Sequence, residues 1–226
     1  MNWLRVKICC ISSLDEAKLA IEAGADALGL VSEMPSGPGA IDRTMIARIA
    51  AAVSPTVDTF LLTSKTDPVE IQHQFEQSGA NTLQLVDWLG TEPFRELRER
   101  CPNARLVQVV HVDSEAQIQM ALDIESDVDA LLLDSGKPKA SPRELGGTGR
   151  THDWLISEQI RRAVSVPVFL AGGLSQTNVS DAIQSVSPHG VDLCSSVRTS
   201  GSLDARKISA FFKTVSPFRV DRPSNP

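Results

Sequence analysis

The feature that most constrains the fold is an alternation of two kinds of segment along the 226 residues. Short runs rich in Leu and β-branched residues alternate with longer amphipathic segments, and we count eight such pairs. Repeated βα units of this kind build a parallel sheet covered by helices. The expected strands are RVKICCI from Arg5, ALGLVS from Ala27, DTFLLTS from Asp58, TLQLVD from Thr82, LVQVVHV from Leu106, ALLLDS from Ala130, VFLAGG from Val168 and VDLCSS from Val191.

Helix boundary signals lie between these runs. Ser13, Asp67 with Pro68, and Ser114 each precede an amphipathic segment, where a side chain can cap the first free N–H groups. Gly24 and Gly79 end two of the segments and predict left-handed caps.

Eight strands in one chain of this length favour closure into a single (β/α)8 TIM barrel, which we expect over residues 1–216. A doubly wound open sheet would need a Gly-rich turn after its first strand, and KICCISS contains none. The polar, proline-rich residues 217–226 predict a disordered tail.

Composition excludes several function classes. A net charge of −6 with dispersed Lys and Arg gives no basic patch, so we expect no nucleic-acid partner. No apolar run approaches the roughly 20 residues of a membrane span, and no signal peptide is visible. We therefore expect no membrane association and a cytoplasmic location.

The four cysteines, Cys9, Cys10, Cys101 and Cys194, have no CxxC spacing, so neither a disulfide framework nor a metal site is expected. The first and last strands of a barrel are neighbours, which would bring Cys9, Cys10 and Cys194 near one another. Adjacent residues of a strand point to opposite faces, so Cys9 and Cys10 should not share a metal.

Chemistry in such barrels lies where the strands end at their carboxyl side. Polar or reactive residues at those positions are Cys9, Asp134, the pair Gly172 and Gly173, and the pair Ser195 and Ser196. Strand alternation puts Lys7 on the face of Cys9, and Asp192 on the face of Cys194. Of the four histidines, only His111 is near a strand end.

Four motifs occur in order at these strand ends: VKIC, LLLDS followed by GGTGRTHDW, LAGGLSQTNV, and VDLCSSV. From Val6 to about Phe212 the chain resembles the phosphoribosylanthranilate isomerase family. The resemblance implies an Amadori rearrangement in tryptophan biosynthesis, in which an N-(5-phosphoribosyl)anthranilate aminoaldose becomes the corresponding 1-deoxyribulose phosphate. It implies no metal and no organic cofactor.

The same resemblance implies catalytic roles for two residues. Ring opening needs an acid, and proton removal from C2 needs a base. By resemblance Asp134 is the acid and Cys9 the base. Lys7 could favour a thiolate at Cys9 or bind a substrate anion.

A phosphate cradle is expected at the loops of Gly172, Gly173, Ser195 and Ser196, where barrels of this kind bind anions through backbone N–H groups. Lys7 and Asp192 complete the set of expected substrate-binding residues.

Structural interpretations of the same residues stand beside these. A cysteine in a strand is more often a small buried apolar side chain, Asp134 could cap a turn, and paired glycines could simply turn the chain.

The sequence departs from the family pattern in four places. The family usually has a basic residue after P-x-S, where this chain has Gly37, Pro38 and Gly39. Val86 replaces a histidine of the fourth strand, Ser196 stands at a glycine of the phosphate loop, and Cys10 replaces the glycine after the catalytic cysteine.

Three hypotheses follow. The first is the isomerase, the second is a paralogue acting on another phosphorylated aminosugar or aldose, and the third is a non-catalytic phosphate-binding barrel. Retention of both Cys9 and Asp134 argues against the third. The expected partner is a phosphorylated small molecule, and the chain is expected to be a monomer or a homodimer.

Overall fold

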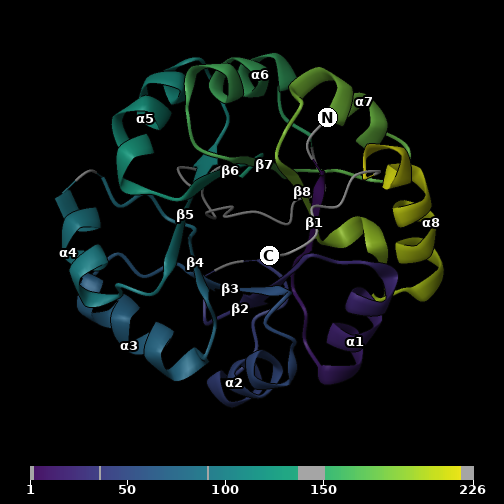
Figure 1. Cartoon of the computed structure of the whole chain (residues 1–226), viewed down its shortest axis with the longest axis horizontal. Helices are drawn as coiled ribbons and strands as arrows, with labels where there is room; N and C mark the ends of the chain where they lie inside the picture. Colours follow the sequence, from purple (N-terminus) through teal and green to yellow (C-terminus); the bar gives the residue numbers. More distant parts are fainter. Residues whose placement is uncertain (1–2, 36, 91, 137–150, 220–226) are drawn as a thin grey trace.

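A computed structural model describes residues 3–35, 37–90, 92–136 and 151–219. Its strands form a closed barrel in the order β1 to β8, with every neighbouring pair parallel (Figure 1). The predicted (β/α)8 fold is therefore confirmed, and the open doubly wound sheet is excluded. The strands are β1 (Arg5–Ile8), β2 (Ala27–Val31), β3 (Asp58–Thr63), β4 (Thr82–Leu85), β5 (Arg105–His111), β6 (Ala130–Asp134), β7 (Val168–Leu170) and β8 (Gly190–Leu193).

Helices surround the barrel as an outer ring (Figure 1). They are α1 (Leu14–Ala23), α2 (Arg43–Ala52), α3 (Pro68–Ser78), α4 (Glu92–Arg100), α5 (Ala116–Ile124), α6 (Trp154–Ala163), α7 (Val179–Val186) and α8 (Ala205–Val215). Short 3-10 turns η1 (Glu125–Asp127), η2 (Ser195–Val197) and η3 (Ser216–Phe218) and a two-stranded hairpin of β9 (Arg198–Thr199) and β10 (Ser202–Leu203) complete the described elements.

The predicted helix caps mostly form as expected. The Ser13 side chain accepts from Glu16 N, and Asp67 accepts from Val69 N and Glu70 N. Gly24 and Gly79 adopt the left-handed conformation at the ends of α1 and α3. The exception is α5, where Ser114 instead bonds the Gln117 side chain and the helix begins two residues later.

The barrel separates two apolar layers because strand side chains alternate. The outward-pointing strand side chains pack under the helices. They include Val6, Ile8, Leu131, Leu133 and Val191. The inward layer is Ala27, Val31, Phe60, Leu62, Val86, Val107, Val109, Ala130, Leu132, Phe169 and Ala171. The interior is thus a packed core that leaves the chemistry to the strand ends.

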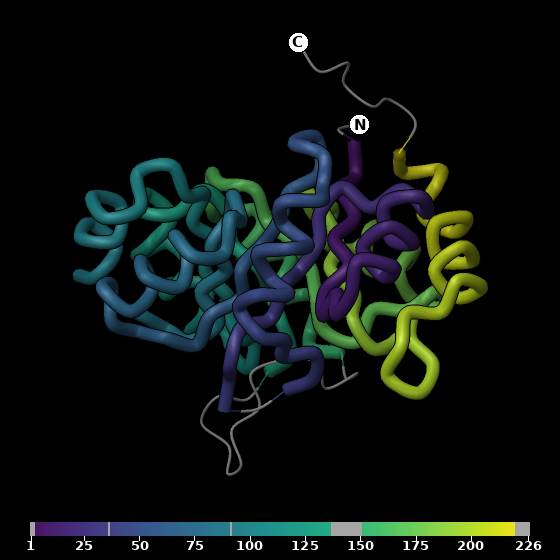
Figure 2. Tube along the Cα trace, turned by 90° about the horizontal axis from the view of Figure 1, so that it is seen from below, coloured from purple at the N-terminus to yellow at the C-terminus, as the bar shows by residue number. Residues whose placement is uncertain are grey.

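The two ends of the barrel have different surroundings. Figure 2 shows that β1 begins and α8 ends at the same end of the barrel. Of the predicted tail, Pro217 and Phe218 belong to η3, and Arg219 donates to Gly24 O and pairs with Asp26. Residues 220–226 lie outside the described residues.

Within the described part of the chain, we find no helix with the length and apolar character of a membrane span.

Candidate active site

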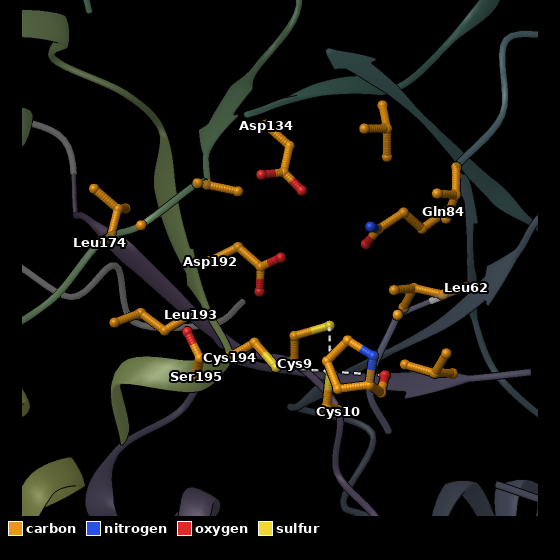
Figure 3. Close-up of a pocket in the computed structure, with 18 of the residues that line it drawn as sticks. Cys9, Cys10, Leu62, Gln84, Asp134, Leu174, Asp192, Leu193, Cys194 and Ser195 are labelled. Carbon is orange, nitrogen blue, oxygen red and sulfur yellow. Dashed lines mark hydrogen bonds between the residues drawn. The ribbon is translucent and has the colours of Figure 1, made fainter. Parts of the chain in front are cut away.

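A pocket opens where the strands end at their carboxyl side, and it contains most of the predicted site residues (Figure 3). Asp134 and Cys9 lie on different sides of this cavity, and Asp192 lies between them in the view of Figure 3. The lining residues are Cys9, Cys10, Val31, Met34, Gly37, Pro38, Leu62, Gln84, Val86, Val109, Asp134, Ala171, Gly172, Gly173, Leu174, Asp192, Leu193, Cys194 and Ser195. Of the predicted set, Lys7 and Ser196 are the two that do not line it.

Cys9 directly follows β1, and its N–H donates to Leu193 O at 2.7 Å, so β8 fixes its backbone. Its side chain continues the inward face that begins with Lys7. Gly29 of β2 makes room for both, because a Cβ at that position would lie 2.9 Å from Cys9 Sγ and 3.1 Å from Lys7 Nζ. Gly29 therefore leaves space for the inward side chains of both Lys7 and Cys9.

Lys7 lies beneath the pocket floor and is fully buried. Its Nζ donates to Asp192 Oδ2 at 2.8 Å, across the register that pairs β1 with β8, and lies 5.2 Å from the centre of the Phe60 ring. Burial lowers the pKa of Lys7, but the adjacent Asp192 carboxylate outweighs it, so the pKa is raised and the ammonium stays charged. Burial raises the pKa of Asp192. The Lys7 charge lowers it by a smaller amount, so the pKa stays above its ordinary value. The second oxygen of Asp192, Oδ1, is buried without a hydrogen-bond partner in the described part of the chain.

Asp134 is the last residue of β6 and is half-buried. Ser135 N donates to its Oδ1 at 2.6 Å. Gly172 packs against His152, because a Cβ placed on Gly172 would lie 3.0 Å from His152 Nδ1. Burial lowers the pKa of His152, and Asp134 raises it in partial compensation. The acid predicted from sequence thus lines the pocket near the half-buried imidazole of His152, whose Nε2 lies 2.6 Å from Ser157 Oγ.

Cys10 departs from strand geometry, because β1 ends at Ile8 and Cys10 has φ +62°. This left-handed conformation favours glycine, which is the residue usual here in the family that the sequence resembles. The turn brings Cys10 Sγ to 3.8 Å from Cys9 Sγ and 2.8 Å from Cys194 Sγ. The expectation that Cys9 and Cys10 point to opposite faces is therefore wrong, because alternation stops where the strand stops. Among the described residues, no group of three His, Cys, Asp or Glu side chains has a geometry that could hold a metal ion.

The predicted phosphate loops adjoin each other at the ends of β7 and β8. Gly172 and Gly173 have φ +79° and +62°, and the Asn178 amide donates to Gly173 O at 3.0 Å. Ser195 lines the pocket as the first residue of η2. Ser196 is not among the positive-φ residues, so the replacement of glycine by serine introduces no backbone strain there.

The described pocket lining includes no Lys or Arg. Lys65 pairs with Glu70 at 3.3 Å, and Arg198 is held by Glu16 at 2.9 Å. Gly37 and Pro38 contribute to the wall where the family pattern has a basic residue, and Val86 lines the wall in place of a histidine. Residues 137–150, which include the GGTGR part of the second motif, lie outside the described residues.

Gln84 is a pocket residue that the sequence analysis missed. Its side chain points into the cavity in Figure 3, and its Oε1 is buried without a partner in the described chain. The available signal was its inward position in the TLQL strand, where a polar residue among apolar neighbours needs a partner. His111, by contrast, does not line the pocket, and its Nε2 contacts Val86 O at 3.1 Å.

Comparison with known proteins gives a consistent result. The model of the N-(5'phosphoribosyl)anthranilate (PRA) isomerase family matches residues 6–214. The chain is similar to N-(5'-phosphoribosyl)anthranilate isomerase 2 of Methanosarcina mazei, with 34% identity over 210 residues that cover 92% of each protein.

Solved structures agree with the sequence matches. The fold is similar to a phosphoribosylanthranilate isomerase in complex with reduced 1-(o-carboxyphenylamino)-1-deoxyribulose 5-phosphate, with a TM-score of 0.77, 28% identity, and coverage of 95% of this chain and 99% of that chain. Monomers generated from the dimeric enzyme of Thermotoga maritima match with the same TM-score, identity and coverage.

Proposed function

Because the chain belongs to the N-(5'-phosphoribosyl)anthranilate isomerase family, we propose that it converts N-(5'-phosphoribosyl)anthranilate to 1-(2-carboxyphenylamino)-1-deoxyribulose 5-phosphate. The observation that carries this proposal is the shared pocket of Cys9 and Asp134, one at the end of β1 and the other at the end of β6. An aldose-to-ketose rearrangement needs an acid and a base that reach different atoms of one sugar.

In the proposed mechanism, the Asp134 carboxyl gives a proton to the ring oxygen of the ribose, the C1–O bond opens, and the anthranilate nitrogen forms a C=N bond to C1. The Cys9 thiolate then removes the proton from C2. The electron pair of that C–H bond forms a C1–C2 double bond, and the C=N electrons return to nitrogen. The resulting enol becomes the ketone when C1 is protonated and the C2 hydroxyl loses its proton.

Substrate positioning is assigned to the polar groups around this pair. Asp192 Oδ1 and Gln84 Oε1 are buried acceptors without described partners, and sugar hydroxyls are suitable donors for both. Backbone N–H groups around Gly173, Ser195 and Ser196 are assigned to the phosphate, since consecutive amides at turns make anion sites. Lys7 is assigned an indirect role, as the cation that keeps Asp192 in place.

The test of the reaction is a fluorescence assay with freshly generated phosphoribosylanthranilate, followed by chromatographic identification of the ketose product. We expect enzyme-dependent conversion that inorganic phosphate inhibits competitively. Absence of conversion by folded protein would contradict the proposal. Competitive inhibition by phosphate that disappears when bulky side chains replace Gly173 would support the assigned anion site.

The absence of a cation from the described pocket lining favours a second candidate, a paralogue that acts on another phosphorylated aminosugar or aldose. A carboxylate without a charged partner loses roughly 1.5–3 kcal/mol of charge-assisted hydrogen bonding. Phosphate binding without turnover of phosphoribosylanthranilate would favour this candidate, with Asp134 and Cys9 retained as its acid and base.

The family's soluble sugar-phosphate chemistry supports a cytoplasmic location, which we include in the proposal. The relative from Thermotoga maritima is described as dimeric, so a homodimer and a monomer are the two states to test for this chain.

A further inference from the structure

Three of the cysteines meet at the seam where β1 and β8 close the barrel. Register pairs Ile8 with Leu193, so the residues that follow these strands leave the barrel side by side. Cys9 and Cys10 follow β1, and Cys194 follows β8. The shortest sulfur contact is between Cys10 and Cys194, at 2.8 Å, compared with 3.8 Å between Cys9 and Cys10.

We propose that Cys10 and Cys194 are a modification site, at which a peroxide generates an intramolecular disulfide between the ends of the first and last strands. The proposal does not depend on the isomerase reaction. It uses Cys10, which occupies a left-handed position that glycine would fill more easily, and whose side chain is packed toward Cys194.

The surroundings of Cys10 hold its sulfur in position for this bond. A Cβ on Gly39 would lie 2.5 Å from Cys10 Cβ, so the loop after β2 is packed directly against this side chain. Arg198 Nη2 donates to the carbonyls of Cys9 and Cys10 at 3.2 and 2.5 Å, which fixes the backbone on the other side. Cys10 therefore has few directions in which to turn away from Cys194.

Exposure and charge distinguish the two thiols. Both cysteines line the pocket, but Cys194 is half-buried and Cys10 is buried, so a small oxidant reaches Cys194 more readily. The hydrogen bond with Cys10 lowers the pKa of Cys194, burial opposes this, and the Arg198 charge lowers it further. The same hydrogen bond raises the pKa of Cys10. Cys194 is thus the attacking thiolate, and Cys10 is the thiol that resolves it.

The chemistry balances with hydrogen peroxide as the oxidant. The Cys194 thiol first loses its proton, and the thiolate attacks one peroxide oxygen. The O–O bond breaks to give a sulfenic acid, and the hydroxide that leaves takes up that proton as the first water. Cys10 sulfur then attacks Cys194 sulfur, the S–O bond breaks, and the thiol proton leaves with hydroxide as water. Two thiols are oxidised by two electrons, and the peroxide is reduced to two waters.

The alternative bond, between Cys9 and Cys10, has unfavourable geometry. Disulfides usually join residues whose Cα atoms are about 4.4–6.8 Å apart. Consecutive Cα atoms are only about 3.8 Å apart across a trans peptide. Cys10 and Cys194 instead follow two neighbouring strands, so no shared peptide bond fixes the separation of their Cα atoms.

The test uses the full chain, reduced and then exposed to hydrogen peroxide before free thiols are alkylated. Trypsin should release residues 8–18 linked to residues 163–198, with fragment ions that assign the bond to Cys10. Thiol titration under denaturing conditions should fall from four groups to two.

Matched serine variants identify the partner. Cys10→Ser should abolish the linked peptides, whereas Cys9→Ser and the remote Cys101→Ser should retain them. A link that persists in Cys10→Ser, or wild-type protein in which peroxide oxidises Cys194 without any link, would overturn the proposal. Because the wild-type measurement stands alone, loss of folding in one variant would not remove the test.

Discussion

Lys7 is one of the largest fully buried side chains, and its position determines much of the pocket floor. Removing an ammonium from water is costly unless a carboxylate and additional contacts compensate for it. Asp192 provides the carboxylate, and Phe60 provides an aromatic face. The floor is therefore an ion pair that encloses Lys7 and leaves the second oxygen of Asp192, Oδ1, for the proposed contact with substrate.

The loop after β2 contains the residue that tests substrate binding most simply. Gly37 lines the pocket, and no atom lies within 4 Å of a Cβ placed there, so an added side chain has room. Gly39 is unsuitable because its Cβ would collide with Cys10. Gly37→Arg should lower the Michaelis constant for phosphoribosylanthranilate about ten- to a hundredfold, since it supplies a charged partner to the carboxylate.

Gly37→Gln is the control for this variant, because it carries the same backbone cost at φ +105° without the charge. Steady-state kinetics on both proteins should separate charge from strain. Equal Michaelis constants for Arg and Gln would contradict the interpretation of this loop and indicate that another cation binds the carboxylate.

At the scale of elements, the ion pair of Glu16 and Arg198 connects α1 to the seam of the barrel. Glu16 accepts from Arg198, Leu203 N and Ser12 N, and Arg198 in turn holds the carbonyls of Cys9 and Cys10. Burial raises the pKa of Glu16, but these hydrogen bonds outweigh burial and lower it below its ordinary value of 4.5. The carboxylate therefore stabilises the fold when it is ionised.

The pH dependence follows from that direction. A carboxyl group with a lowered pKa in the folded state stabilises the protein above its unfolded pKa and loses that contribution as pH falls through the folded pKa. The difference in unfolding free energy between wild type and Glu16→Gln should be greatest near about pH 7 and shrink between roughly pH 5 and pH 3. Urea denaturation across this range measures it, and a constant difference would contradict the assignment.

Much of the fold was predictable at this scale because each strand and most caps depend on local pattern. The runs that start at Arg5, Ala27 and Asp58 become β1, β2 and β3 with the same first residues. The path after Ile8 was not predictable, because it depends on packing between Cys10, Gly39 and Cys194. Gln84 was missed although its inward position in TLQL was a signal, because that pattern does not show that the position faces the pocket.

For the molecule as a whole, stability and chemistry lie at opposite ends of the barrel. At the end where the strands begin, Asp58 pairs with Arg5 at 2.6 Å and also with Arg105, which ties together the first residues of β1, β3 and β5. Residues at this end of a barrel contribute to stability rather than to catalysis.

Asp58→Ala should therefore reduce the free energy of unfolding by about 1–2 kcal/mol, a modest value because both arginines are partly exposed. Turnover should stay within about twofold of wild type, because the pocket is at the other end of the barrel. Chemical denaturation and steady-state kinetics on the same preparation measure both. A large loss of turnover in folded protein would contradict this separation.

The proposed reaction requires Cys9 and Asp134 to work as base and acid on one substrate. The most direct measurement is turnover of phosphoribosylanthranilate by wild type, Cys9→Ala and Asp134→Ala, with folding checked by urea denaturation and the anion site checked by phosphate binding. We predict that each substitution lowers turnover at least roughly a hundredfold while phosphate still binds. Near wild-type turnover by either folded variant would contradict the assignment of acid and base.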